Sequence, residues 1–159
     1  SIRSISLVHE RLYMSDNLGR IDFRQYVENL TLGLFRTYGI SHETVTVSVD
    51  ISGIFFGVDV AVPCGLVINE LISNTLKHAF PEDFSGDRNL SIRLRERGAG
   101  GYRLTVRDTG IGLPEGLIPE ESATLGLKLV TILIEDQMRG SFTVRNNPGA
   151  EYSIDFITD

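Results

Sequence analysis

Three polar side chains run along one side of residues 69–80, which read NELISNTLKHAF. Glu70, Asn74 and Lys77 stand at i, i+4 and i+7, so a helix would place them on one face. An amide oxygen binds hard divalent cations, an ammonium balances phosphate charge, and a carboxylate can orient a metal-bound water. The stripe fits a site for a metal ion with phosphates. Taken alone, it fits a solvated helix face with an ion pair equally well.

Two glycine-bearing segments follow this stripe. Residues 106–114 read VRDTGIGLP, in which Asp108 ends a β-like run, and residues 122–130 read SATLGLKLV, a loop leading into an amphipathic helix. Glycines let a backbone turn sharply and pass close to a ligand. The free N–H groups at the start of a helix can meet phosphates. The two-glycine motif alone is a weak signal, and its weight comes from its order after the polar stripe.

The order of the three motifs carries a family resemblance. An N-E-x-x-x-N helix, then D-x-G-x-G, then a glycine at a helix start resembles the GHKL (Bergerat-fold) nucleotide-binding module. Sensor histidine kinases, the gyrase B subunit, the mismatch-repair ATPases and a heat-shock chaperone share that module. The chain looks most like the catalytic, ATP-binding domain of a sensor histidine kinase of the subfamily with an NELxxNxxKHA motif. Residues 6–30 also resemble the second dimerisation helix and the linker after it.

The resemblance implies ATP and Mg²⁺ as cofactors and assigns roles on the long helix. Asn74 is implied as the metal ligand, and Glu70 as a catalytic residue that orders water around the metal, compatible with slow ATP hydrolysis. Lys77 and His78 stand where the family contacts phosphates. A surface amide at Asn74 and a structural histidine at the helix end are the alternatives.

The downstream motifs are implied to hold the base and the phosphates. Asp108 would accept a hydrogen bond from the exocyclic amine of adenine, which guanine lacks at that position; the alternative is a turn aspartate that caps its own backbone. Gly110 and Gly112 would pass close to the ring. At the next helix the phosphate-binding positions are Leu125, Gly126 and Lys128, and an ordinary surface cation is the alternative for Lys128.

Two features depart from the family pattern. The family often carries a threonine in the final hairpin that helps to bind the adenine amine through water. Ala150 stands in that vicinity and cannot do so, which leaves either a thinner adenine shell or a contribution from Thr143. The phosphoacceptor histidine of the family would precede Ser1, since neither His9 nor His42 has a matching context.

Composition restricts the class of protein. The 159 residues are 42% hydrophobic and 23% charged, as in a globular domain, and the net charge of -6 argues against nonspecific nucleic-acid binding. The single cysteine, Cys64, excludes an intrachain disulfide and lies in an apolar run. Without a secretory or membrane-spanning apolar run, we expect a cytoplasmic setting.

Periodicity predicts four helices. They cover residues 2–14, 22–38, the long motif helix and residues 125–138. Asp22 is a candidate N-cap and Gly39 a helix end, and we expect Pro63 in the first turn of the motif helix. Phe80 before a proline should close that helix. A cation and a glycine at residues 139–140 should cap the last helix.

Alternating apolar residues predict the strands. We expect strands at residues 45–49 and 54–58, and hairpins formed by residues 90–108 and 141–156. These elements predict a two-layer α/β sandwich, with a mixed, mostly antiparallel sheet covered on one face by three helices. We expect residues 1–20 to be a remnant of a dimerisation helix and linker, and residues 21–159 to be the catalytic domain.

Three functions remain open. The first is the catalytic part of a histidine autokinase, acting on the phosphoacceptor helices of the same protein and feeding a response regulator, with the full-length protein a homodimer. The second, favoured by Glu70, is an ATPase or conformational clamp. The third is a degenerate nucleotide-binding scaffold. Nucleic acid is not expected as a partner.

Overall fold

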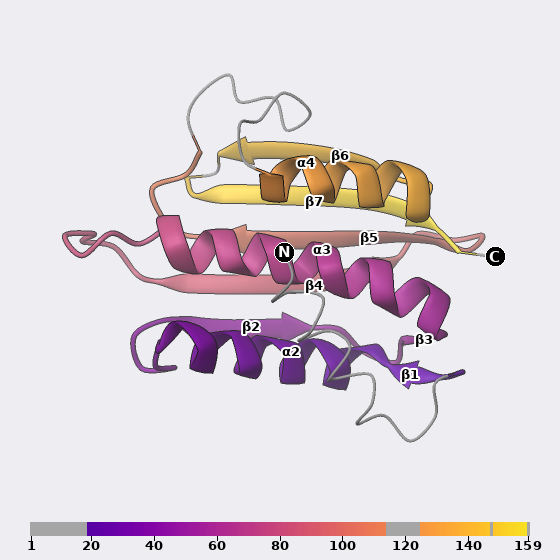
Figure 1. The fold of residues 1–159 in the computed structure, drawn as a ribbon, viewed down its shortest axis with the longest axis horizontal. Coiled ribbons are helices and arrows are strands. Elements are labelled where there is room, and N and C mark those ends of the chain that lie inside the picture. The colour runs from indigo at the N-terminus through magenta and orange to yellow at the C-terminus, as the bar shows by residue number, and fades with distance from the viewer. Residues whose placement is uncertain (1–18, 114–124, 147, 159) are drawn as a thin grey trace.

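A five-stranded sheet covered on one face by helices forms the protein (Figure 1). The computed structural model describes residues 19–113, 125–146 and 148–158. The elements in chain order are β1 (Ile21–Asp22), α2 (Phe23–Tyr38), β2 (Thr46–Asp50), β3 (Phe55–Phe56), α3 (Val58–His78), β4 (Asn89–Glu96), β5 (Gly101–Asp108), α4 (Leu125–Ile132), the π-helical segment η2 (Leu133–Gln137), β6 (Ser141–Asn146) and β7 (Ala150–Ile157).

The sheet has the strand order β2-β4-β5-β7-β6. β2 pairs with β4 in parallel, and the other neighbours are antiparallel. Both predicted hairpins, β4–β5 and β6–β7, are present, and β1 and β3 pair separately. α2, α3 and α4 lie side by side across one face (Figure 1), with α3 in contact with both of the others. The predicted two-layer sandwich is confirmed.

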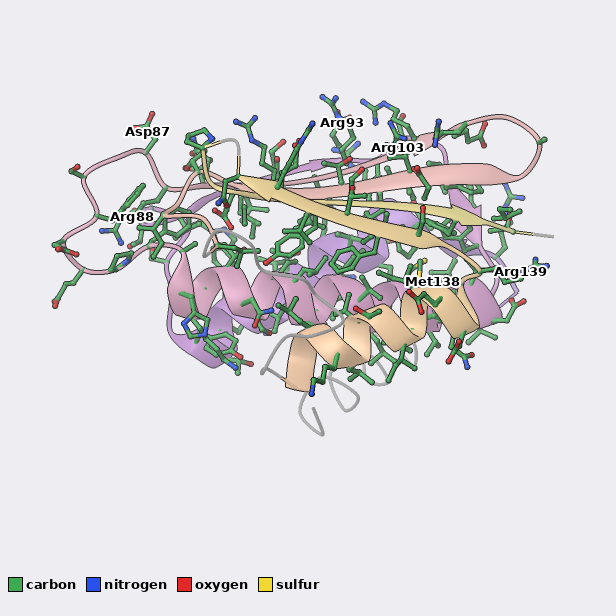
Figure 2. The ribbon with its side chains drawn as sticks, turned by 90° about the horizontal axis from the view of Figure 1, so that it is seen from above. Asp87, Arg88, Arg93, Arg103, Met138 and Arg139 are labelled. Atoms are coloured by element: carbon green, nitrogen blue, oxygen red, sulfur yellow. The ribbon has the colours of Figure 1, made fainter. Side chains whose placement is uncertain are left out.

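Strand alternation separates the core from the open face of the sheet. Leu90, Ile92 and Leu94 of β4 are buried beneath the helices. Arg93 and the β5 residue Arg103 point away from the helices (Figure 2). Arg103 donates two hydrogen bonds to Asp155, at 2.7 and 3.0 Å, and its guanidinium lowers the pKa of that carboxyl. The open face of the sheet therefore carries exposed ion pairs.

Both predicted ends of α2 are confirmed. Asp22 accepts a hydrogen bond from the N–H of Gln25 at 3.3 Å, which satisfies one of the free donors of the first turn. Gly39 ends the helix with φ of 64° and donates to the carbonyl oxygens of Arg36 and Phe35. Because only glycine adopts this left-handed conformation without a steric penalty, Gly39 is a natural stop for the helix.

The start of α3 corrects the sequence prediction. The helix begins at Val58, so Pro63 lies within its second turn rather than its first. Gly57 starts it, since its carbonyl oxygen accepts from Val60 and Ala61 at 3.2 and 2.9 Å. The expected strand at residues 54–58 is reduced to Phe55–Phe56. Valines alternate at the start of this helix and mimic a strand, which explains the error.

The end of the last helix also differs from the prediction. α4 passes into the π-helical η2, which closes when Met138 N–H donates to Leu133 at 3.0 Å. Arg139, and not Gly140, takes the left-handed conformation, with φ of 51°. Gly140 N–H donates to the Ile134 carbonyl oxygen at 2.8 Å, which is the predicted capping role, and a methyl group at this position would lie 2.3 Å from the Asp155 carbonyl oxygen.

The remaining expectations concern the first predicted helix, His42, Cys64 and membrane-spanning segments. The predicted helix over residues 2–14, with His9, lies outside the described residues. His42 stacks on Phe35 with ring centroids 4.6 Å apart, which is a packing role. Cys64 is buried, as predicted. No helix in the described ranges is long and apolar enough to cross a membrane.

Candidate nucleotide site

The polar stripe lies on α3, the middle helix of the layer. Glu70 is buried, Asn74 is half-buried, and Lys77 and His78 are exposed at the last turn. The opposite side of the helix carries Leu71 and other apolar residues into the core. The stripe is therefore present as predicted, and its solvent exposure increases from a buried carboxylate to exposed cations.

Asp108 ends β5 beneath α3 and is 2% exposed. Its Oδ1 accepts hydrogen bonds from the backbone N–H groups of Gly110, at 2.9 Å, and Ala150, at 3.2 Å. Its Oδ2 accepts from the Thr75 hydroxyl on α3 at 3.1 Å. The turn-capping interaction with Gly110 is therefore real, but it is only one of several that fix the carboxylate between the helix, its own turn and the final hairpin.

The turn after Asp108 is bound to the end of α3. Ile111 N–H donates to the Ala79 carbonyl oxygen at 2.9 Å. A methyl group at Gly110 would lie 2.3 Å from that same oxygen, so this position has to be glycine. On the other side, the Thr109 hydroxyl accepts from the Asn89 N–H at 2.9 Å. These contacts hold the first glycine motif rigidly between the helix and β4.

Asn146, at the end of β6, holds the next part of the turn. Its Oδ1 accepts from Leu113 N–H and its Nδ2 donates to the Leu113 carbonyl oxygen, both at 2.8 Å. Gly112, just before, has φ of 79°, and a methyl group there would lie 2.6 Å from the Asn146 Oδ1. The second glycine is therefore required both by its conformation and by this bridge.

Glu70 connects the stripe to the start of α4. A methyl group at Gly126 would lie 2.9 Å from the Glu70 Oε2, so the carboxylate rests against the first turn of that helix. All three sequence motifs therefore meet at α3. Residues 108–113 lie at the carboxyl end of this helix, and Gly126 lies beside Glu70, which is one turn before Asn74.

The cations near the polar stripe are less tightly placed. The Lys77 ammonium lies 5.6 Å from the ring centroid of Tyr38 on α2, and not against the glycine motifs. His78 is exposed, and so is Lys128 on α4. Leu125 begins α4. These positions do not form a closed cage in the part of the chain that the structure describes.

The final hairpin brings backbone and an aromatic ring close to Asp108. Ala150 offers its N–H to Asp108 but has no hydroxyl. Burial, together with the Asp108 carboxylate nearby, raises the pKa of the Tyr152 phenol. Thr143 pairs with Ser153, one residue out of phase with Tyr152. Because alternate residues face opposite sides of a sheet, Thr143 lies on the open face, and the suggested contribution from Thr143 is wrong.

The donor set fits a magnesium ion held mainly by its nucleotide. Within the described ranges, no cluster of three histidine, cysteine or acidic residues could hold a metal by itself. Magnesium commonly takes one or two protein ligands and completes its shell with phosphates and waters. The half-buried Asn74 amide and the neighbouring Glu70 carboxylate supply hard oxygen donors of this kind.

Two cavities lie at the other end of the sandwich. They measure about 480 and 450 Å³ and share Tyr102, Arg139 and Ile157 in their linings. None of the motif residues lines either of them. They are therefore separate from the place where the motifs meet.

A family comparison decides the class of the site. Residues 59–158 match the model of the histidine kinase-, DNA gyrase B- and HSP90-like ATPases. The chain belongs to this ATPase family. The match spans α3, both glycine motifs and the final hairpin, and residues 1–38 match a second model, described as histidine kinase. The ATPase-family part is thus an ATP-binding catalytic domain of the histidine-kinase type.

Curated relatives of this ATPase-family chain are sensor histidine kinases. It is 29% identical over 145 residues to the sensor histidine kinase PdtaS of Mycobacterium tuberculosis, covering 91% of this chain and 28% of PdtaS. It is also 29% identical over 113 residues to the blue-light-activated histidine kinase 2 of Erythrobacter litoralis, covering 70% and 32%. The chain thus spans less than a third of the length of these relatives.

Solved structures share the fold. The histidine kinase domain of the Erythrobacter litoralis EL346 blue-light-activated kinase superposes with a TM-score of 0.79 at 22% identity, covering 98% of this chain and 72% of that one. The Acinetobacter baumannii histidine kinase AdeS gives 0.67 at 18% identity, covering 99% and 75%. The arrangement of sheet and helices is therefore that of histidine kinase domains.

Two site residues escaped sequence reasoning. Thr75 lies among apolar residues on the buried side of α3, yet its hydroxyl donates to Asp108. Asn146 ends β6 in the final hairpin, yet its side-chain amide bridges to Leu113, far from it in the sequence. The sequence gives one usable signal for Thr75: a polar β-branched residue among apolar neighbours within a helix needs a partner for its hydroxyl when buried.

Proposed function

We propose that this chain binds Mg²⁺-ATP between α3, the residue 108–113 turn and the start of α4, and directs the γ-phosphate to a histidine. The observation that carries the proposal is the buried Asp108 carboxylate, fixed by three hydrogen bonds where the motifs meet. A carboxylate held in this way is a preorganised acceptor for the adenine amine. Gly110 and Gly112 let the backbone pass close to the base.

The phosphate side is assigned to the stripe and to α4. Asn74 is proposed to bind the metal, which balances phosphate charge when it is present. Glu70 orders water near the metal, and Gly126, with Leu125, opens the helix end toward the phosphates. Further charge is proposed to come from exposed side chains at the rim, namely Lys77, His78 and Lys128.

The acceptor of the phosphate is proposed to be a histidine on dimerisation helices of the same protein. The histidine-kinase match over residues 1–38 supports this, together with the sensor histidine kinases among the relatives. We further propose residues 1–20 as the end of that helical region, residues 21–159 as the catalytic domain, a homodimer as the full-length form, and a response regulator as the final recipient.

The test is phosphate transfer to a supplied acceptor. The chain is incubated with ATP labelled at the γ-phosphate, alone and with a separately produced helix pair that carries the phosphoacceptor histidine. We expect acid-labile label on the supplied pair and none when the pair carries glutamine in place of that histidine. Tight ATP binding with no transfer under any condition would contradict the kinase assignment while leaving the nucleotide site intact.

Glu70 favours a second function, ATP hydrolysis. Its carboxylate is buried beside the start of α4, one turn before Asn74, where a general base for water could stand. Rapid phosphate release without an acceptor, lost in Glu70→Gln, would support an ATPase. Slow release that is unchanged in Glu70→Gln would leave the carboxylate an ordering role.

A further inference from the structure

The hydrogen bonds on Asp108 leave little unused acceptor capacity. An ionised carboxylate offers about four lone-pair sites, two on each oxygen. Oδ1 accepts from two backbone N–H groups, of Gly110 and Ala150, and is thereby filled. Oδ2 accepts from Thr75. Of the bonds within the described residues, this leaves one site, on Oδ2, for a ligand.

The Thr75 hydroxyl therefore shares an oxygen with any base amine that Asp108 binds. Thr75 is 3% exposed and sits on α3, which packs against β5, so its position is set by the helix and not by a loop. A hydroxyl has one proton to donate. Because this proton is donated to Oδ2 in a hydrogen bond, the Thr75 oxygen can act only as a hydrogen-bond acceptor toward any other group.

We propose that Thr75 is a positioning and specificity-determining residue of the nucleotide site. Its donated hydrogen bond fixes the Asp108 carboxylate so that the last lone pair of Oδ2 points at the adenine amine. The same bond withholds the hydroxyl proton from the carbonyl oxygen that a 6-oxopurine carries in place of the amine. The Thr75 hydroxyl and the Asp108 carboxylate therefore present only acceptors to the base. Ala150 on β7 has no hydroxyl to offer, so the hydroxyl at the Asp108 carboxylate comes from Thr75 on α3. This inference rests on the proposed ATP site.

The proposal differs from a purely structural role in what it predicts for the base. A threonine that merely satisfied a buried carboxylate would affect folding and all nucleotides equally. A threonine that orients Oδ2 affects the preference for a 6-amino over a 6-oxo purine, because a carboxylate freed from this bond can rotate and no longer directs its lone pair at the 6-amino group.

Two variants at position 75 separate these roles. Thr75→Val keeps the shape and β-branching but removes the hydroxyl, whereas Thr75→Ser keeps the hydroxyl. Thr31→Val on α2 is the matched control, because its buried hydroxyl donates only to the Val27 carbonyl oxygen at 2.8 Å. Dissociation constants for ATP and inosine triphosphate, with Mg²⁺, and melting temperatures are measured for each protein.

We expect Thr75→Val to weaken ATP binding about tenfold, the value of one hydrogen bond to a charged group. Inosine triphosphate binding should change less than threefold, so the ratio of the two constants falls. Thr75→Ser should restore the ratio to within about twofold, and Thr31→Val should leave it unchanged.

Two results would overturn the assignment. The first is an unchanged ratio in Thr75→Val, whatever its stability, which would make Thr75 structural. The second is a Thr75→Ser protein that behaves like Thr75→Val, which would make the methyl group the important part. Failure of the ATP site itself looks different, because then Asp108→Asn would bind both nucleotides as the parent does.

Discussion

The proposed adenine end and the proposed phosphate end of the site are built differently. At the adenine end, Asp108 is 2% exposed and receives its hydrogen bonds from fixed elements. At the phosphate end, Asn74 is half-buried, and Lys77 is exposed with its ammonium above the Tyr38 ring. The hydrogen-bonding groups of the first end are held in place, whereas the charged side chains of the second end are exposed and less tightly placed.

This difference follows from what each end binds. A purine is a rigid, largely apolar ring with few polar edges, so recognition requires acceptors held at fixed places. A triphosphate with its metal carries high charge, which exposed groups can meet over a range of positions. In the proposed function, rigid hydrogen bonding gives selectivity at Asp108, while charge and metal ligation give binding energy near Asn74.

The largest effect should come from removing the fixed carboxylate. Asp108→Ala leaves the donors of Thr75, Gly110 and Ala150 without their acceptor, at a cost of about 1–3 kcal/mol each. We expect ATP binding to fall more than about 100-fold and the melting temperature to drop, measured by calorimetry. Asp155→Ala, on the open face, is the control and should cost under about 1 kcal/mol without changing affinity.

The next largest effect should come from Asn74, the proposed metal ligand. In Asn74→Ala we expect the affinity for ATP with Mg²⁺ to fall to the value that the parent shows with a chelator, about tenfold or more. Affinity for adenosine, which carries no phosphate, should not change. Magnesium dependence that persists in the variant would move the metal ligand elsewhere.

One substitution made at each end sharpens the comparison. Gly110→Ala drives a methyl group against the Ala79 backbone, at 2.3 Å, and should destabilise the fold by about 1–3 kcal/mol. Gly126→Ala meets only the Glu70 side chain, at 2.9 Å, which can move, and alanine favours the helix. We expect its stability to change by less than about 1 kcal/mol, as measured in urea. Equal losses at both positions would erase the contrast.

The smallest effect should come from Lys77. Lys77→Ala loses a contact with Tyr38 that is worth about 0.5–1 kcal/mol at an exposed site, and one mobile charge near the phosphates. We expect ATP affinity to fall less than about fivefold, mainly at low ionic strength. A loss as large as that of Asn74→Ala would mean that this end is as firmly organised as the other.

The sequence predicted the sandwich, both hairpins and the α2 caps because each depends on local patterns: alternation, turn residues and capping side chains. It placed Pro63 wrongly, since alternating valines before it mimic a strand and only the Gly57 carbonyl bonds reveal the helix. The roles assigned to Asn74 and Asp108 remain predictions.

The missed contacts are long-range. The Thr75 bond to Asp108 spans 33 positions, as does the Asn146 bridge to Leu113. No local pattern encodes such pairs, since they depend on how β5, α3 and the final hairpin pack together.

A crystal structure of the chain with Mg²⁺ and a non-hydrolysable ATP analogue tests the central claim most directly. The account predicts the exocyclic amine of adenine within hydrogen-bonding distance of Asp108 Oδ2 and the metal bound to the Asn74 side-chain oxygen. An adenine ring bound away from Asp108, with the carboxylate still holding only Thr75, Gly110 and Ala150, would contradict it.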